Sequence, residues 1–291
     1  MTDLGAVCLP QLPPERLAAL ARHADDVGLD ELWLWEDCFL GGGIACASAA
    51  LAWTSRMRVG IGLLPVPLRN VAIAAMEVAS LHRLFPDRAI VGVGHGVQDW
   101  MGQVGARASS PLTLLREYVT ALRALLRGER LDTQGRYVRL DGVALDWPPL
   151  TSPPVLVGAT GPRTLRLAGE VGDGTILTAS TTEDEVRVAR AAIDDGRAAT
   201  GRAALVEAHR VVVYLLAATG DGAAERLDAE RRSSKLGQRH GVAGDAAAVA
   251  DAVARYGAAG ADTVVLQPTV DDPDPEGFVR FVAEQVRPLV P

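Results

Sequence analysis

Short apolar runs alternate with longer amphipathic segments along almost the whole chain. The apolar runs are rich in Val, Leu and Ile and have strand-like lengths; they cover residues 4–9, 31–36, 57–64, 88–94, 154–159, 174–179, 210–217 and 262–267. The segments after them repeat apolar residues at i, i+3 and i+4, which is typical of helices; they cover residues 14–28, 44–55, 70–84, 111–128, 162–172, 182–201, 245–260 and 275–289. Strict alternation predicts the α/β class with a parallel sheet, and eight strand–helix pairs favour a closed (β/α)8 TIM barrel in a single domain, residues 1–291.

Two segments depart from this alternation. Residues 130–154, between the fourth and fifth strands, alternate apolar and polar positions around Asp141 and Gly142, which predicts an insertion hairpin with an Asp-Gly turn. Residues 220–244 are charged and poor in large apolar side chains. We expect a mobile helical lid or a surface helix there.

Composition and charge narrow the functional classes. The chain has 48% hydrophobic but only 4% aromatic residues, which suits a core of small aliphatic side chains between helices and parallel strands. A net charge of -7 argues against nonspecific nucleic-acid binding. Three cysteines without metal-ligand spacing indicate free thiols, with no disulfide and no metal site. No leader pattern or long apolar span occurs, so we expect a cytoplasmic protein without membrane contact.

The end of the fourth strand has an unusual density of glycine. Gly92, Gly94 and Gly96 alternate around His95 in the run AIVGVGHGVQDW. Active sites of TIM barrels lie at the carboxyl ends of the strands, and glycine in a strand permits close approach of another group. We therefore expect a cofactor or substrate to lie against this backbone, with His95 facing it; a structural histidine is the alternative.

Acidic residues follow the second strand, in the run WEDCFLGGG. Glu36 and Asp37 stand at the predicted mouth of the barrel, next to Cys38. An acid there is suited to positioning a cofactor ring or moving a proton. The alternative is a helix N-terminal acid that stabilises the helix dipole.

An anion site is predicted after the fifth strand, in the run GATGPRTL. Thr160 and Gly161 precede Pro162, and Arg163 and Arg166 follow it in the first helical turn. Backbone N–H groups at a helix N-terminus bind phosphate well, although a well-capped turn would have the same pattern. No Walker, Rossmann, nucleophile-elbow or HExxH pattern occurs, which argues against nicotinamide binding of the Rossmann type and against hydrolysis.

Three segments carry a resemblance to a known family. Residues 54–96, 115–145 and 153–177 resemble the luciferase-like monooxygenase superfamily, and in particular its branch that uses the deazaflavin coenzyme F420, which includes methylenetetrahydromethanopterin reductase and sugar-phosphate dehydrogenases. The similarity covers about residues 28–178. It also implies the (β/α)8 barrel.

The resemblance assigns roles to residues at the strand ends. Gly62 and Leu63 match a bulge with a non-prolyl cis peptide that supports the cofactor ring, and Asp37 matches an acid near that ring. Thr160, Gly161 and Arg163 match the residues that hold the cofactor phosphate. Catalytic roles are therefore predicted for Asp37 and His95, and cofactor contacts for Asp37, Gly62, Leu63, Gly94, His95, Gly96, Ala159, Thr160, Gly161 and Arg163.

Two positions depart from the family pattern. Cys38 stands where the family often has histidine, so a histidine acting from that loop is missing. Val97 stands where the sugar-phosphate dehydrogenases have glutamate, which disfavours a sugar-phosphate substrate.

The resulting hypothesis is an F420-dependent oxidoreductase that transfers a hydride between the deazaflavin and a small organic substrate, and that forms a homodimer. The first alternative is an FMN-dependent monooxygenase that uses reduced flavin and O2, with a separate flavin reductase supplying electrons. The second is a non-catalytic flavin-binding subunit, against which the glycines and the acid at the strand ends argue.

Overall fold

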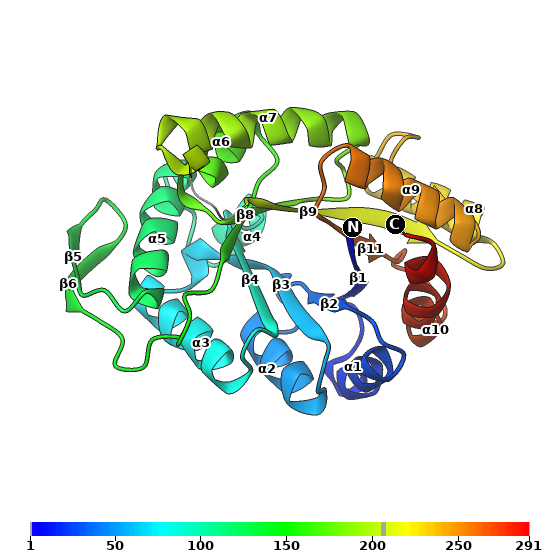
Figure 1. Ribbon diagram of the computed structural model, residues 1–291, viewed down its shortest axis with the longest axis horizontal. Helices are drawn as coiled ribbons and strands as arrows, with labels where there is room; N and C mark the ends of the chain where they lie inside the picture. The colour runs from blue at the N-terminus through cyan, green and yellow to red at the C-terminus, as the bar shows by residue number, and fades with distance from the viewer. Residues whose placement is uncertain (1, 205–207, 291) are drawn as a thin grey trace.

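The computed structural model describes residues 2–204 and 208–290, and these form a barrel of parallel strands inside a ring of helices (Figure 1). Neighbouring strands pair in the order β9-β11-β1-β2-β3-β4-β7-β8, and β8 pairs with β9 to close the barrel. The eight strands are β1 (Asp3–Cys8), β2 (Glu31–Leu34), β3 (Arg58–Pro65), β4 (Ala89–Gly94), β7 (Val155–Gly158), β8 (Gly174–Leu177), β9 (Arg210–Ala218) and β11 (Thr263–Gln267). The predicted TIM barrel is confirmed.

The predicted helices form the outer ring, with ends within a few residues of the expected positions. They are α1 (Leu17–Asp26), α2 (Gly43–Trp53), α3 (Val71–Leu84), α5 (Pro111–Leu126), α6 (Pro162–Val171), α7 (Glu183–Ala199), α9 (Ala246–Ala258) and α10 (Pro275–Arg280), which continues as a π turn (Phe281–Val286) and a 3-10 turn (Arg287–Leu289). Proline occupies the first position of α5, α6 and α10, where a missing N–H costs nothing. Across the described residues, no helix has both the length and the apolar character that a bilayer crossing requires.

The insertion hairpin lies outside α5, on the edge of the barrel (Figure 1). It consists of β5 (Leu131–Gln134) and β6 (Arg139–Val143), joined by a turn over residues 135–138. The predicted turn at Asp141 and Gly142 is wrong, because both residues lie inside β6. Gly142 has φ 60° next to a register shift in the pairing, and its N–H donates to the Asp132 carboxylate at 2.7 Å. A bulge needs the same positive φ as a hairpin turn, so the Asp-Gly signal marked the bulge.

Residues 220–244 form the surface helix that was one of the two expectations. Helix α8 (Ala223–Ser233) packs on β9, and β10 (Val242–Ala243) pairs with the end of β9. A second short helix, α4 (Gln98–Gln103), follows β4 and was not predicted. Six residues are too few to show a helical period.

The barrel has one core inside the strands and another between strands and helices. Aliphatic residues dominate both cores, and the inner one also contains Trp33, a large and fully buried side chain; the inner residues are Val7, Trp33, Ile90, Leu156, Ile176, Val212, Tyr214 and Val265. The rings of Trp33 and Tyr214 meet edge to face with centroids 6.0 Å apart. This aromatic pair fills the middle of the barrel interior.

A buried carboxylate closes the amino-terminal end of the barrel. Glu31 is fully buried on β2 and accepts hydrogen bonds from Trp33 Nε1 at 2.9 Å and from Arg210. Arg58 Nη2 lies 2.9 Å from the same carboxylate. These contacts compensate the charge and leave the carboxyl ends of the strands as the open end.

Candidate active site

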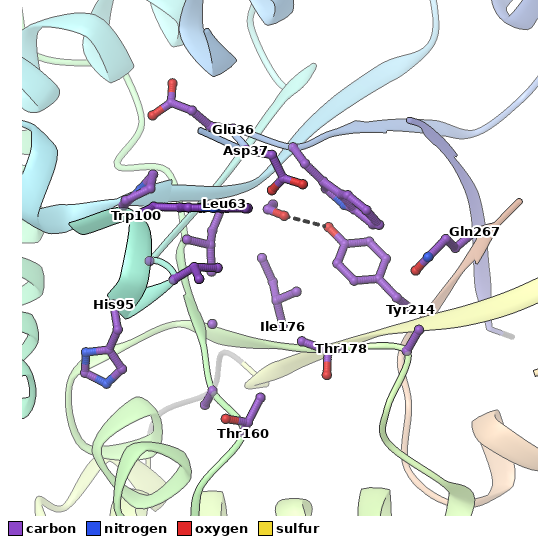
Figure 2. A pocket seen from close by; sticks show the side chains of 18 residues that line it. Glu36, Asp37, Leu63, His95, Trp100, Thr160, Ile176, Thr178, Tyr214 and Gln267 are labelled. Atoms are coloured by element: carbon purple, nitrogen blue, oxygen red, sulfur yellow. Dashed lines mark hydrogen bonds between the residues drawn. The ribbon is translucent and has the colours of Figure 1, made fainter. Parts of the chain in front are cut away.

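A cavity of about 430 Å³ opens at the carboxyl ends of the strands, within the usual range of small-molecule sites, and 18 residues line it (Figure 2). Most of the predicted site residues belong to this wall: Asp37, Gly62, Leu63, His95, Gly96, Ala159 and Thr160. Gly94, Gly161 and Arg163 lie outside it. The strand ends thus bring together residues that are far apart in the sequence.

One wall of the cavity is a bulge in β3. Pairing with β4 skips from Ile61 to Leu64, so Gly62 and Leu63 project out of the ladder. The peptide bond between them is cis, as the family resemblance implied. Leu63 thereby lines the cavity (Figure 2).

Glycines beside this bulge make room for protein side chains. A Cβ at Gly94 or Gly158 would lie 2.6 or 2.2 Å from Leu63 Cδ2, and a Cβ at Gly92 would lie 2.3 Å from Ile176 Cδ1. The packing of Ile176 and Leu63 therefore accounts for Gly92 and Gly94, and a cofactor contact at Gly94 stays a prediction. Gly96 does line the cavity, at φ 67°.

Tyr214 supports the bulge from the opposite side of the barrel. Its hydroxyl donates a hydrogen bond to the Gly62 carbonyl at 3.2 Å (Figure 2), and its ring meets Trp35 edge to face at 5.4 Å. Burial raises the pKa of the Tyr214 hydroxyl, so it stays protonated as a donor. The sequence analysis missed this residue because its strand, RVVVYLLAA, has the composition of ordinary core; a lone tyrosine within an aliphatic run was the available signal.

The two acids after β2 have different surroundings. The Glu36 carboxylate accepts from the Gly43 N–H at the start of α2 and from Arg69 Nη2, both at 2.7 Å. Glu36 is therefore an acid at a helix N-terminus, the alternative considered for this run. Asp37 has no side-chain hydrogen bond or ion pair with any described residue, and burial raises the pKa of its carboxyl. Asp37 is thus the carboxyl group in this wall that is free to act on a bound molecule.

His95 lies at the edge of the cavity, with its ring directed away from Asp37 (Figure 2). Its Nε2 atom lies 3.2 Å from the Thr164 hydroxyl, in the first turn of α6. Burial lowers the pKa of His95, which favours the neutral ring. The geometry links the end of β4 to α6, and a catalytic role for His95 stays a prediction.

The N-terminus of α6 has the features expected of an anion site. Gly161 is its N-cap and Pro162 its first residue. The N–H groups of Thr164 and Leu165 both bond to the Gly161 carbonyl, whereas those of Gly161 and Arg163 have no partner among the described residues. The Arg163 side chain is exposed in this turn. Free N–H groups and the positive end of the helix dipole therefore lie next to Thr160, which lines the cavity.

Comparisons with known proteins agree with this geometry. The model of the family described as luciferase-like monooxygenase matches residues 2–260. The 5,10-methylenetetrahydromethanopterin reductase of Methanolobus tindarius is 32% identical over 181 residues, which cover 62% of this chain and 55% of that protein. The F420-dependent glucose-6-phosphate dehydrogenase of Kineococcus radiotolerans is 33% identical over 58% of this chain and 53% of its own. The chain thus spans about half the length of these curated relatives.

Solved structures share the fold over nearly the whole chain. The coenzyme F420-dependent tetrahydromethanopterin reductase from Methanopyrus kandleri superposes with a TM-score of 0.85 at 22% identity, covering 99% of both chains. An F420-dependent secondary alcohol dehydrogenase superposes with a TM-score of 0.87 at 20% identity, covering 100% of this chain and 99% of the other. With the family match over residues 2–260, the conclusion is that this chain belongs to the luciferase-like monooxygenase family.

Proposed function

We propose that this protein is an F420-dependent oxidoreductase that transfers a hydride between the deazaflavin and a small organic substrate. The observation that carries the proposal is the cavity itself, with the Gly62–Leu63 bulge as one wall and the α6 N-terminus at its rim. The name of the F420-dependent relative at 33% identity supports the same cofactor.

The residues present fit such a cofactor. A flat ring needs an apolar wall, and the Leu63 side chain is held in place between Gly94 and Gly158. A phosphate needs donors, and the N–H groups of Gly161 and Arg163, which have no partner among the described residues, supply them. When bound, the deazaflavin would donate or accept the hydride. The protein's own part is to support the ring, bind the phosphate and exclude water.

Proton transfer falls to Asp37 in this proposal. Its carboxyl faces the cavity without a partner among the described residues, and burial raises its pKa toward the range in which it can hold or release a proton. His95 is the second candidate, through its contact with Thr164.

The test is a fluorescence titration of the purified protein with coenzyme F420 and, in parallel, with FMN. We expect F420 to bind more tightly, and Arg163→Gln to weaken that binding about fivefold, the effect of roughly 1 kcal/mol from one charge at the phosphate. Arg166→Gln is the matched control, because Arg166 pairs with Glu170 at 3.2 Å.

The other outcomes separate the alternatives. Preferential FMN binding would overturn the proposal and direct assays to O2 consumption with a flavin reductase. Binding of F420 without F420-dependent oxidation or reduction of any substrate would favour a non-catalytic subunit.

A homodimer is part of the proposal. Helices α2 and α3 carry exposed apolar side chains on the outer ring, among them Trp53, Ile73 and Met76. Exposed apolar side chains of this kind favour association. Light scattering should give twice the monomer mass, and Met76→Glu should shift it toward the monomer, whereas Val188→Glu, on the exposed face of α7, should not.

Three free thiols, Cys8, Cys38 and Cys46, support the cytoplasm as the location.

A further inference from the structure

A second cavity, of about 480 Å³, shares no lining residue with the first. Its walls come from residues 66–71 after β3, residues 105–108 before α5, α5 itself, and residues 137–139 at the tip of the insertion hairpin, which lies beside α5 (Figure 1). An ion pair separates the two cavities, because Glu36 lines the first and its partner Arg69 lines the second. The volume of the second cavity is in the range of small-molecule sites.

All the charged side chains that line this second cavity are arginines. Arg69, Arg107 and Arg139 contribute guanidinium groups, and no carboxylate is among the described lining residues, although the whole chain has a net charge of -7. Arg69 pairs with Glu36 and, at 3.2 Å, with Glu77, both outside the wall. The excess positive charge of the cavity therefore comes from the other two arginines.

Arg107 and Arg139 keep N–H groups that a ligand can use. Arg139 donates from Nε to the Gly135 carbonyl at 3.3 Å and forms no ion pair with a described carboxylate. Arg107 donates to the Gln98 carbonyl at 2.8 Å, and Asp99, which pairs with it at 3.4 Å, is 95% exposed and contributes little. Guanidinium groups with free N–H donors are suited to bind a carboxylate.

A tyrosine in the same wall has a hydroxyl without a partner. Tyr118 on α5 is only 3% exposed, and its hydroxyl makes no hydrogen bond with any residue that the structure describes. Burial raises the pKa of Tyr118, so the hydroxyl stays a donor at neutral pH. By contrast, the hydroxyl of Tyr137 in this wall accepts from the Ser110 N–H at 2.7 Å. Because a buried donor without an acceptor is costly, Tyr118 indicates a ligand that accepts from it.

The remainder of the wall is mostly aliphatic. Val66, Val71, Leu114 and Val138 line it, and each is more than nine-tenths buried. A bare anion would lose its water against these side chains without compensation, whereas an apolar group gains free energy by leaving water there. The wall is therefore complementary to a molecule that has both an apolar body and a charged end.

We propose that this second cavity binds a small carboxylate with an apolar body. The guanidinium groups of Arg107 and Arg139 bind the carboxylate, Tyr118 donates a hydrogen bond to the ligand, and the apolar body packs against the valines and Leu114. This ligand site is separate from the proposed hydride transfer and does not depend on it.

The experiment compares 3-phenylpropanoate with 3-phenylpropanamide, its uncharged analogue, and with inorganic phosphate. Calorimetric titration of the purified protein at neutral pH measures the three affinities. We expect the carboxylate to bind at least about tenfold more tightly than the amide, since hydrogen bonds to a charged group are worth that factor. Equal binding of carboxylate and amide, or no binding of the carboxylate at millimolar concentrations, would overturn the inference. Phosphate binding as tight as that of the carboxylate would overturn the role of the apolar wall.

Two variants in the insertion hairpin form a matched pair. Arg139→Gln should weaken binding of the carboxylate about fivefold and leave the amide within about twofold. Arg130→Gln changes the net charge equally, but Arg130 donates to the Gly142 carbonyl and does not line the cavity, so it should leave both affinities unchanged. Equal losses of carboxylate binding in the two variants would contradict a site at Arg139.

Two further variants distinguish the cavities. Tyr118→Phe should weaken binding of the carboxylate about threefold without lowering the thermal midpoint, because no hydrogen bond within the protein is lost. Asp37→Asn, in the first cavity, should leave the carboxylate affinity within about twofold. Tighter binding in Asp37→Asn together with unchanged binding in Tyr118→Phe would place the carboxylate in the first cavity and overturn the inference.

Discussion

One carboxylate lies at the start of β2 and another in the loop after it, at opposite ends of the barrel, and their contacts differ completely. At the closed end, Glu31 is fully buried and is held by Arg58, Arg210 and the Trp33 indole. At the open end, Asp37 is half-buried and has no polar side-chain partner among the described residues. A buried charge is retained for stability only where its surroundings compensate it. An uncompensated carboxyl in a cavity wall instead indicates a functional site.

The largest loss of unfolding free energy is expected from replacing the buried Glu31 at the closed end of the barrel. Glu31→Gln should lower the free energy of unfolding by about 3 kcal/mol, because two arginines lose the charge that compensates them. Urea denaturation measures this. The control is Glu129→Gln, which breaks an exposed pair with Arg127 and should cost less than about 1 kcal/mol. Similar losses in the two variants would contradict the distinction between buried and exposed pairs.

A methyl group at the bulge should disturb the wall of the open end. The Cβ of Gly62→Ala would lie 1.9 Å from the Tyr214 hydroxyl, so we expect a loss of about 2 kcal/mol in unfolding free energy. Combining it with Tyr214→Phe removes the overlapping atom, and the double variant should lose less than the sum of the single ones. A double-mutant cycle in urea tests this, and additive losses would show that the clash is not the cause.

Two buried tyrosines allow a finer comparison. Tyr214 donates to the Gly62 carbonyl at 3.2 Å in the cavity wall, and Tyr256 donates to the Thr181 carbonyl at 2.9 Å outside it. Each Tyr→Phe change should cost about 1 kcal/mol of stability. Tyr214→Phe should in addition weaken F420 binding about fivefold, since it frees the bulge, whereas Tyr256→Phe should not. Fluorescence titration of both variants decides, and equal affinities would mean that Tyr214 does not hold the wall.

The smallest expected effect is a gain in the free energy of unfolding, from Asp37→Asn. Burial raises the pKa of Asp37 above its ordinary 3.8, so ionised Asp37 costs the folded state free energy. This cost is absent below the ordinary pKa and complete above the raised one. Asp37→Asn should therefore gain up to about 1 kcal/mol at neutral pH, and the gain should vanish as the pH falls toward 4. Urea melts at both pH values measure it, and a destabilised variant at neutral pH would contradict the assignment.

Local patterns were sufficient for most of the architecture. The alternation of apolar runs and helical periods predicted all eight barrel strands because a strand buried on both faces must be apolar throughout. Pro111 and Pro162 began helices where expected, since proline fits a first helical turn. The six-residue helix α4 and the bulge at Gly142 were not predicted, because neither has a sequence period long enough to distinguish it.

The sequence by itself determined the barrel, the strand ends at which a site must lie, and the acids and glycines available there. The tertiary structure decided what those residues do. Closure of the sheet brought Tyr214 against Gly62, 152 positions away in the chain, and brought Leu63 into the space at Gly94 and Gly158. The fold also places the Arg69 guanidinium in hydrogen-bond contact with the Glu36 carboxylate, whereas no guanidinium among the described residues contacts Asp37. Pairing across a barrel depends on strand register and closure, and neighbours in the sequence carry no record of either.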